Sequence, residues 1–356
     1  MRNMDSKRWF LGILISAIFI FLSCGLCIYI IDPYFHYRRP SNGLIYGNSP
    51  SERYINDGII SNFDYDAIIT GTSMIQNFKV SEFNSLFGLE SVKLPMSGGS
   101  YREVDSLCKR ALSKRPDIQV ILRGLDLRLI NADKDAMQSY AYPEYLYNDN
   151  RLDDINYLLD KHSLLQGCGM NVIMATIRKR EPFDFDNYAN WNNKYEFGKD
   201  AVLSSYERPE KSGTVFRLSE AERTTVRGNI EQNVTATAKE YPDTRFILFF
   251  TPYSICYWDV LSQEGRLTES IQMQEEVIEL LLPYENIELY SFCDNFELVC
   301  NLDNYMDMAH YSEDVNSQML QWILEGEYRI TEDNFQDYLD KIMDFYGNYD
   351  YDSIYE

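Results

Sequence analysis

The chain has 356 residues, enough to bury a complete hydrophobic core, and a formal net charge of −22. Residues 1–40 carry a net charge of +3, so the rest of the chain carries −25. Such an acidic body repels nucleic-acid phosphates and anionic headgroups, which excludes nucleic acid as a partner and docking of the body on anionic lipid through its charge. One large domain with an anchor fits this length better than two equal domains.

The seven cysteines form no metal-binding pattern. Cys24 and Cys27 lie in an apolar stretch, and no Cys-x-x-Cys pair occurs outside it, so we expect no zinc site. Cys293 and Cys300 fit a short-loop disulfide if the domain lies outside the cell. They fit two separate small core residues equally well.

Residues 9–31 form a run of 23 residues without a charge. As a helix this run is about 35 Å long, which is enough to cross a hydrocarbon core of about 30 Å. The apolar run continues past the small residues Cys24 and Gly25, which favours an uncleaved anchor over a signal peptide. Basic residues in segment 1–8 predict a cytoplasmic amino terminus, and therefore a single-pass protein of the cell membrane with its body outside the cell.

Residues 32–62 contain three prolines and predict an irregular juxtamembrane lead-in. The body, residues 63–330, then alternates short apolar runs with amphipathic stretches. This alternation predicts an α/β fold, a three-layer αβα sandwich with a five-stranded parallel sheet. We expect strands at 66–70, 91–95, 119–125, 245–251 and 286–291, and helices at 101–114, 219–240, 266–282 and 313–325.

Two segments depart from this alternation. Residues 127–218 form a long insertion rich in Tyr, Asn and Asp, which is either a lid or cap over the strand ends or a surface excursion. Residues 331–356 form an acidic tail in which 335–345 predicts an amphipathic helix. We expect the last ten residues to be disordered.

The most informative site candidate is Ser73, which follows the apolar strand at 66–70 within a Gly-Thr-Ser turn. Open α/β sheets bind ligands at the carboxyl ends of their strands, and a serine there becomes a nucleophile if a held histidine removes its proton. Only three histidines exist. His36 lies among interfacial aromatics and His162 has no acidic or cysteine partner at ligand spacing, whereas His310 has Asp307 three residues before it. We therefore expect Ser73, Asp307 and His310 to converge.

An oxyanion needs hydrogen-bond donors, and backbone amides at a tight turn supply them well. Gly98 and Gly99 follow the second expected strand, and Asp126 follows the third. We expect the amides of Ser73 and of one or both glycines to hold the oxyanion, with Asp126 as a further polar group at the same sheet edge.

These residues together resemble the SGNH (GDSL-type) hydrolases. The segment 71–74 (Gly-Thr-Ser-Met) is similar to the block with the nucleophilic serine, Gly98 or Gly99 falls at the oxyanion glycine, and 307–310 (Asp-Met-Ala-His) is similar to the terminal Asp-x-x-His block. With the anchor, the chain looks closest to membrane-tethered SGNH-like proteins of bacterial cell-surface polymers, including those of teichoic acid D-alanylation and alginate O-acetylation. The resemblance covers residues 64–325 discontinuously and implies a flavodoxin-like sandwich that needs no metal or organic cofactor.

Three positions depart from the family pattern. Thr72 stands where those hydrolases usually carry Asp, Met74 stands in place of Leu, and Asp126 is the nearest candidate for the third-block Asn. An ionised Asp only accepts hydrogen bonds, so Asp126 must be protonated to hold an oxyanion, or must serve elsewhere.

The expected function is that of an extracytoplasmic serine acyl-esterase or O-acyltransferase acting on a cell-surface or secreted glycan. Its expected partners are the glycan or acyl donor, the membrane and membrane proteins of polysaccharide assembly. The alternative is a non-catalytic SGNH-like protein for glycan binding or assembly, which the departures and the insertion rich in aromatic and amide side chains favour.

Overall fold

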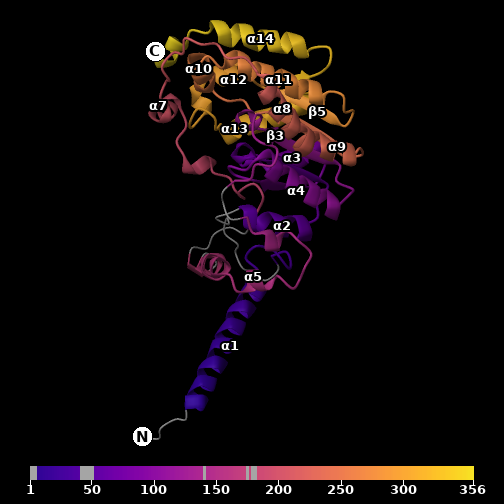
Figure 1. Cartoon of the computed structure of the whole chain (residues 1–356), viewed down its shortest axis with the longest axis vertical. Helices are drawn as coiled ribbons and strands as arrows, with labels where there is room; N and C mark the ends of the chain where they lie inside the picture. The colour runs from indigo at the N-terminus through magenta and orange to yellow at the C-terminus, as the bar shows by residue number, and fades with distance from the viewer. Residues whose placement is uncertain (1–5, 41–51, 139–141, 174–175, 178–182) are drawn as a thin grey trace. The chain divides into compact units, whose positions relative to one another are not determined.

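The structure of the protein is a computed structural model that describes residues 6–40, 52–138, 142–173, 176–177 and 183–356 (Figure 1). The chain divides into two compact units, one of residues 1–63 with 141–184 and one of residues 64–140 with 185–356. Parts of the expected amino-terminal segment 1–8, lead-in 32–62 and insertion 127–218 lie outside the described residues.

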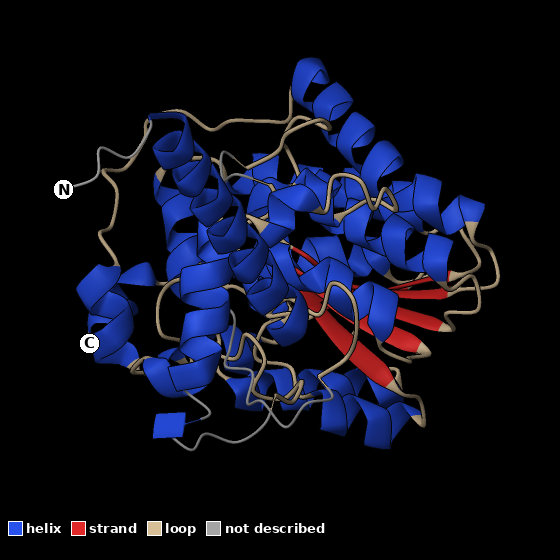
Figure 2. Ribbon diagram, turned by 90° about the horizontal axis from the view of Figure 1, so that it is seen from below, coloured by secondary structure: helices blue, strands red, loops and turns tan. Residues whose placement is uncertain are grey.

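The second unit is built on a six-stranded, mostly parallel sheet (Figure 2). Its strand order is β2-β1-β3-β4-β5-β6, and only β6 runs antiparallel to its neighbour. The five expected strands are present and parallel. The expectation of five strands in all is wrong, because β6 has only two residues and is too short to leave a periodic pattern in the sequence. The strands are β1 (Ala67–Gly71), β2 (Ser91–Pro95), β3 (Val120–Leu125), β4 (Arg245–Phe250), β5 (Ile287–Ser291) and β6 (Arg329–Ile330).

The central strands β1 and β3 are buried at every position and are mostly apolar, as expected of strands that are covered on both faces. From β1 the chain first adds β2 on one side and then β3 on the other, with Ala67 paired to both Ser91 and Val120. The carboxyl end of β1 is therefore the point at which the direction of strand addition reverses. Ligand crevices of open parallel sheets form at such points.

Helices pack on both faces of the sheet (Figure 2). On one face α13 packs against α3, and on the other α4 packs against α9 and α8 against α11. Capping boxes begin α4 at Ser100 and α8 at Ser219, and a π-turn at 231–235 divides the expected helix 219–240 in two. The helices of this unit are α3 (Val80–Phe87), α4 (Tyr101–Lys114), α7 (Lys199–Ser205), α8 (Glu220–Ile230), α9 (Ala236–Glu240), α10 (Ile255–Gln263), α11 (Leu267–Leu281), α12 (Phe296–Cys300), α13 (Glu313–Glu325) and α14 (Phe335–Asn348).

The carboxyl-terminal segment is folded onto this unit. Helix α14 contacts α10 and α11, and its Tyr346 stacks on Trp258 at a ring distance of 3.9 Å. The expected disorder of the last ten residues is wrong, because residues 351–355 form a 3₁₀ turn in which Tyr351 and Ile354 are buried. The burial of aromatic side chains supplies the free energy that orders the tail. The acidic composition of the tail suggested disorder instead.

The first unit contains the apolar helix α1 (Ser6–Ile31), a helix of 26 residues with a mean hydropathy of 2.6 over its most apolar window. Among the described residues α1 alone is long and apolar enough to cross a membrane. The described residues of this unit also contain helices α2 (Glu52–Asn62), α5 (Ile155–Leu158) and α6 (Gly169–Ile173), with a π-turn at 163–168 between the last two. Helix α2 lies in the segment 32–62 that was expected to be irregular, so that expectation is wrong for residues 52–62.

All seven cysteines are free thiols, so Cys293 and Cys300 are separate residues in this structure. Cys293 is buried and Cys300 is half-buried. Of the two alternatives that the sequence leaves open, the structure has the unpaired one.

Candidate active site

Ser73 begins a 3₁₀ turn directly after β1. The Thr72 side chain caps this turn by accepting a hydrogen bond from the Met74 amide. Gly71 has a φ of 149°, and a Cβ there would lie 2.9 Å from Ile75 and 3.3 Å from the Gly124 nitrogen, so this position requires glycine. The sharp turn lifts the Ser73 hydroxyl out of the strand and into a pocket.

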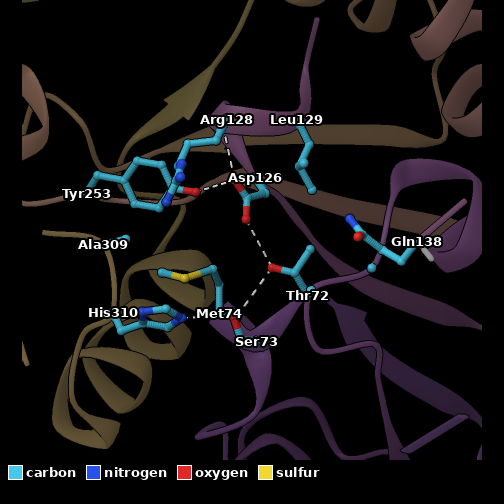
Figure 3. Close-up of a pocket in the computed structure, with 12 residues that line it drawn as sticks. Thr72, Ser73, Met74, Asp126, Arg128, Leu129, Gln138, Tyr253, Ala309 and His310 are labelled. Atoms are coloured by element: carbon cyan, nitrogen blue, oxygen red, sulfur yellow. Dashed lines mark hydrogen bonds between the residues drawn. The ribbon is translucent and has the colours of Figure 1, made fainter. Parts of the chain in front are cut away.

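Ser73, His310 and Asp307 form a continuous hydrogen-bonded relay. Figure 3 shows its first contact, between Ser73 and His310. Ser73 Oγ lies 2.9 Å from His310 Nε2, and His310 Nδ1 lies 2.8 Å from Asp307 Oδ2. A carboxylate only accepts hydrogen bonds, so Nδ1 carries the proton and Nε2 is left to accept the proton of the serine. This is the tautomer that a general base requires.

Burial and hydrogen bonding act in opposite directions on the Asp307 carboxyl group. Burial alone raises its pKa, but the His310 ring, by hydrogen bond and charge, and the His310 and Ala309 amides together hold the pKa below the ordinary 3.8. Both amides donate to Oδ1 at 2.8 Å, so the carboxylate is fixed from two sides. Asp307 is therefore an ionised and oriented partner for the imidazole.

The loop that carries Asp307 and His310 is fixed at both ends and in its middle. Tyr305 and Tyr311 form a β-bridge that closes it, and the Met306 amide donates to the His310 carbonyl at 3.0 Å. In the middle, the Met308 carbonyl accepts from the Ser254 amide at 3.1 Å and from its hydroxyl at 2.9 Å. Ser254 follows β4, so the histidine loop is attached to the same sheet that carries Ser73.

The end of the expected insertion 127–218 contributes residues that sequence reasoning missed. The Trp191 ring packs edge-on against the His310 ring at 5.5 Å, and Asn192 Oδ1 accepts from the Glu313 amide at 2.9 Å. Ser312 stands at the N-cap of α13 without a side-chain cap bond, and Asn192 supplies an acceptor at the start of this helix instead. The only signal in the sequence was the aromatic and amide composition of the segment.

No model of a protein family matches the chain, and no curated protein matches it either. A search of solved structures finds a protein from Streptococcus pneumonia, provisionally described as a platelet activating factor, at 12% sequence identity and a TM-score of 0.38. The match covers 77% of this chain and 91% of the other. It assigns neither a family nor an activity, so the functional argument depends on the geometry of the site.

Two backbone amides near Ser73 Oγ are candidates to hold an oxyanion. Within the described part of the chain, the amides of Ser73 and Gly98 have no hydrogen-bond acceptor. Gly98 has a φ of 59°, which glycine adopts without strain. The Gly99 amide donates to the Met96 carbonyl at 2.8 Å. Gly99 is therefore a turn residue that also lines the pocket, and Gly98 is the better donor candidate of the two.

Asp126 is near Ser73 but is occupied as an acceptor. Its carboxylate accepts from the Thr72 hydroxyl at 3.2 Å, from the Arg128 amide at 3.1 Å and from the Tyr253 hydroxyl. Burial, and then the Asp126 charge, raise the pKa of Tyr253 well above 10, so this phenol stays a donor. A carboxylate with three donors cannot act as an oxyanion donor, and that expectation for Asp126 is corrected. Asp126 instead links the turns after β1, β3 and β4.

The pocket in front of Ser73 has a volume of about 260 Å³ (Figure 3). Gln138 and Arg128 line it with polar groups that the sequence did not single out. In the described residues neither side chain has an ion-pair or hydrogen-bond partner, so both are available to a ligand. No group of three or more His, Cys, Asp or Glu side chains that could hold a metal ion occurs among the residues described.

Proposed function

We propose that the protein is a membrane-anchored serine acyl-esterase or O-acyltransferase of the SGNH type, which acts on the O-acyl groups of a cell-surface or secreted glycan. The observation that carries the proposal is the relay of 2.9 Å and 2.8 Å contacts from Ser73 through His310 to Asp307. These distances lie within the range that nucleophile and base require. The order of the five parallel strands is that of flavodoxin-like sheets, which supports the SGNH-type sandwich.

In the first half of the proposed reaction, Ser73 Oγ attacks the carbonyl carbon of the acyl ester while its proton passes to His310 Nε2. The carbonyl π electrons move to oxygen, and the amides of Ser73 and Gly98 donate to that oxyanion. The ionised Asp307 stabilises the imidazolium that forms. Collapse of the intermediate breaks the bond to the sugar oxygen, which takes the proton from His310 and leaves an ester on Ser73.

In the second half, water or a hydroxyl group of a second sugar attacks the Ser73 ester. His310 accepts the proton of the attacking group and then returns a proton to Ser73 Oγ as the acyl bond breaks. Water gives hydrolysis and a sugar hydroxyl gives transfer. The relay is the same in both reactions, so the proposal covers both.

The choice of a glycan as substrate is supported by the character of the site and the anchor. The pocket is lined by Gln138 and Arg128 and lies in a unit that is rich in exposed polar side chains. Helix α1, by length and composition, fits a span that would keep the enzyme at the cell surface, where such polymers are assembled. An extracellular position of the body belongs to the same proposal.

Labelling with a fluorophosphonate tests the proposal directly, because only an activated serine reacts. The full-length protein in detergent should be labelled at Ser73, and Ser73→Ala should abolish both labelling and hydrolysis of 4-nitrophenyl acetate. Ser113→Ala is the matched control, since Ser113 is an exposed serine of α4 and its loss should change neither. Equal activity in Ser73→Ala would reject the assignment and leave the non-catalytic glycan-binding alternative.

A further inference from the structure

The first unit exposes a group of large apolar side chains that its own fold does not cover. They lie between residues 152 and 177, and the most exposed are Leu152 at 87%, Leu165 at 70% and Ile177 at 73%. The 15 residues 163–177 contain no charged side chain. Scattered exposed apolar residues are ordinary on soluble proteins, but a concentration of them in one segment marks an interaction surface.

This apolar segment packs against the carboxyl-terminal end of α1. A Cβ on Gly25 would lie 3.6 Å from the Leu158 carbonyl oxygen, so α5 touches α1 at this glycine. The π-turn at 163–168 contacts α1, and a Cβ on Gly167 would lie 2.8 Å from Pro33. Small residues thus allow close packing along the final turns of α1 and the residues just after it.

The depth of these contacts follows from the length of α1. A helix of 26 residues is about 39 Å long, against a hydrocarbon core of about 30 Å, so its last turns reach the boundary between acyl chains and headgroups. Segments that pack on those turns lie at the same boundary. Residues 163–173 are helical, so their backbone groups are largely satisfied internally, as a lipid environment requires.

We propose that residues 152–173 and 176–177 lie in the membrane interface beside α1, with Leu165 and Ile177 inserted among the lipid acyl chains. The proposal depends on α1 spanning a membrane. Its uncharged run, the 15 residues 163–177, is too short to cross the bilayer and has the length of an interfacial or re-entrant element. Lipid is the occupant because the apolar surface is continuous with α1, whose own large side chains are exposed along most of its length. Unit one is thereby held against the bilayer by two elements.

Site-specific photo-crosslinking of the full-length protein in lipid nanodiscs tests the proposal. A benzophenone amino acid is placed at Leu165, at Ile177, at Phe19 of α1 and at Val215, and lipid adducts are counted by mass spectrometry. Val215 is the matched control, because it is 69% exposed but belongs to the other unit, on a loop after α7. We expect Leu165 and Ile177 to give roughly the lipid yield of Phe19, and Val215 to give only background.

The outcomes separate the failure of this proposal from that of the anchor. Lipid adducts at Phe19 without adducts at Leu165 and Ile177 would overturn the interfacial placement alone. Absence of adducts at Phe19 as well would overturn the anchor on which it depends. Crosslinks from Leu165 or Ile177 to a second protein chain instead of lipid would also reject it. A near-ultraviolet circular dichroism spectrum matching that of the wild type verifies that each labelled protein is folded.

Discussion

At the scale of single residues, the two oxygens of the Asp307 carboxylate have different tasks. One carboxylate oxygen accepts the amides of Ala309 and His310, and the other accepts the His310 ring. The first task fixes the backbone turn, and the second fixes the tautomer and orientation of the imidazole. Because a charged acceptor strengthens both sets of hydrogen bonds, the ionisation of Asp307 links the stability of the loop to the orientation of the imidazole.

This link predicts how stability depends on pH. The pKa of Asp307 is lowered in the folded state, so its contribution is fully present above the unfolded value of 3.8 and is lost as the pH falls through the folded value. The difference in unfolding free energy between the wild type and Asp307→Asn should be largest near neutrality and should shrink below about pH 4. Urea unfolding monitored by tryptophan fluorescence measures it. A difference in unfolding free energy that grows as the pH falls would contradict the predicted direction. Asp303→Asn is the control, because Asp303 is an exposed residue near Asp307 in the sequence.

Arg128 predicts a preference among substrates. Its guanidinium lines the pocket without an ion-pair partner in the described chain, in a protein of net charge −22. An ester whose alcohol carries phosphate or carboxylate would gain a charge-assisted hydrogen bond there. Arg128→Gln should raise KM for such an ester roughly tenfold and leave neutral 4-nitrophenyl acetate unchanged. Arg217→Gln, which removes an exposed arginine away from the pocket, should affect neither ester, and an equal loss on both esters in Arg128→Gln would refute the anion preference.

At the scale of elements, the site is assembled from the ends of four parallel strands and the start of one helix. The turns after these strands supply Ser73 (β1), Gly98 (β2), Asp126 (β3) and Tyr253 (β4), and the loop entering α13 supplies His310. Because parallel strands end at one edge, residues far apart in the sequence meet there. The start of α13 depends on Asn192, which comes from neither the strands nor the helix.

Asn192 should therefore matter for both stability and rate. Asn192→Ala removes the acceptor for the Glu313 amide and should destabilise the protein by about 1 kcal/mol, the usual effect of losing an N-cap acceptor. Since α13 begins three residues after His310, kcat should fall as well. Asn192→Asp keeps the acceptor oxygen and should restore both properties. Thermal unfolding and ester hydrolysis measure them, and a failure of Asp to rescue would show that packing and not the cap is the cause.

At the scale of the whole molecule, the protein joins a strongly acidic body to an apolar helix. The negative charge of the body is repelled by anionic lipid headgroups, so apolar contacts have to attach the protein to the bilayer. Helix α1 offers 26 residues for this, with only Ile28 and Ile31 buried within the protein. The exposed apolar side chains of α1 suit a lipid environment better than contact with water.

This arrangement predicts the behaviour of the protein in cells. It should remain in the membrane pellet after alkaline carbonate extraction, and protease added to intact cells should digest the body. Ile13→Arg with Phe19→Arg should release it or block its insertion, because each arginine near the helix centre costs about 2.5–3.5 kcal/mol. A body that resists external protease, yet is digested after lysis, would reverse the proposed topology.

The sequence by itself determined the strands at 66–70 and 245–251, the apolar helix and the pairing of His310 with Asp307, because each is a local pattern of hydrophobicity or spacing. Only the tertiary structure decided that Asp126 is an acceptor for Tyr253 and Thr72, that Asn192 caps α13 and that β6 joins the sheet. These features depend on hydrogen bonds between residues far apart in the chain. Such contacts leave no periodic signal in a single sequence, because their geometry exists only once the sheet has formed.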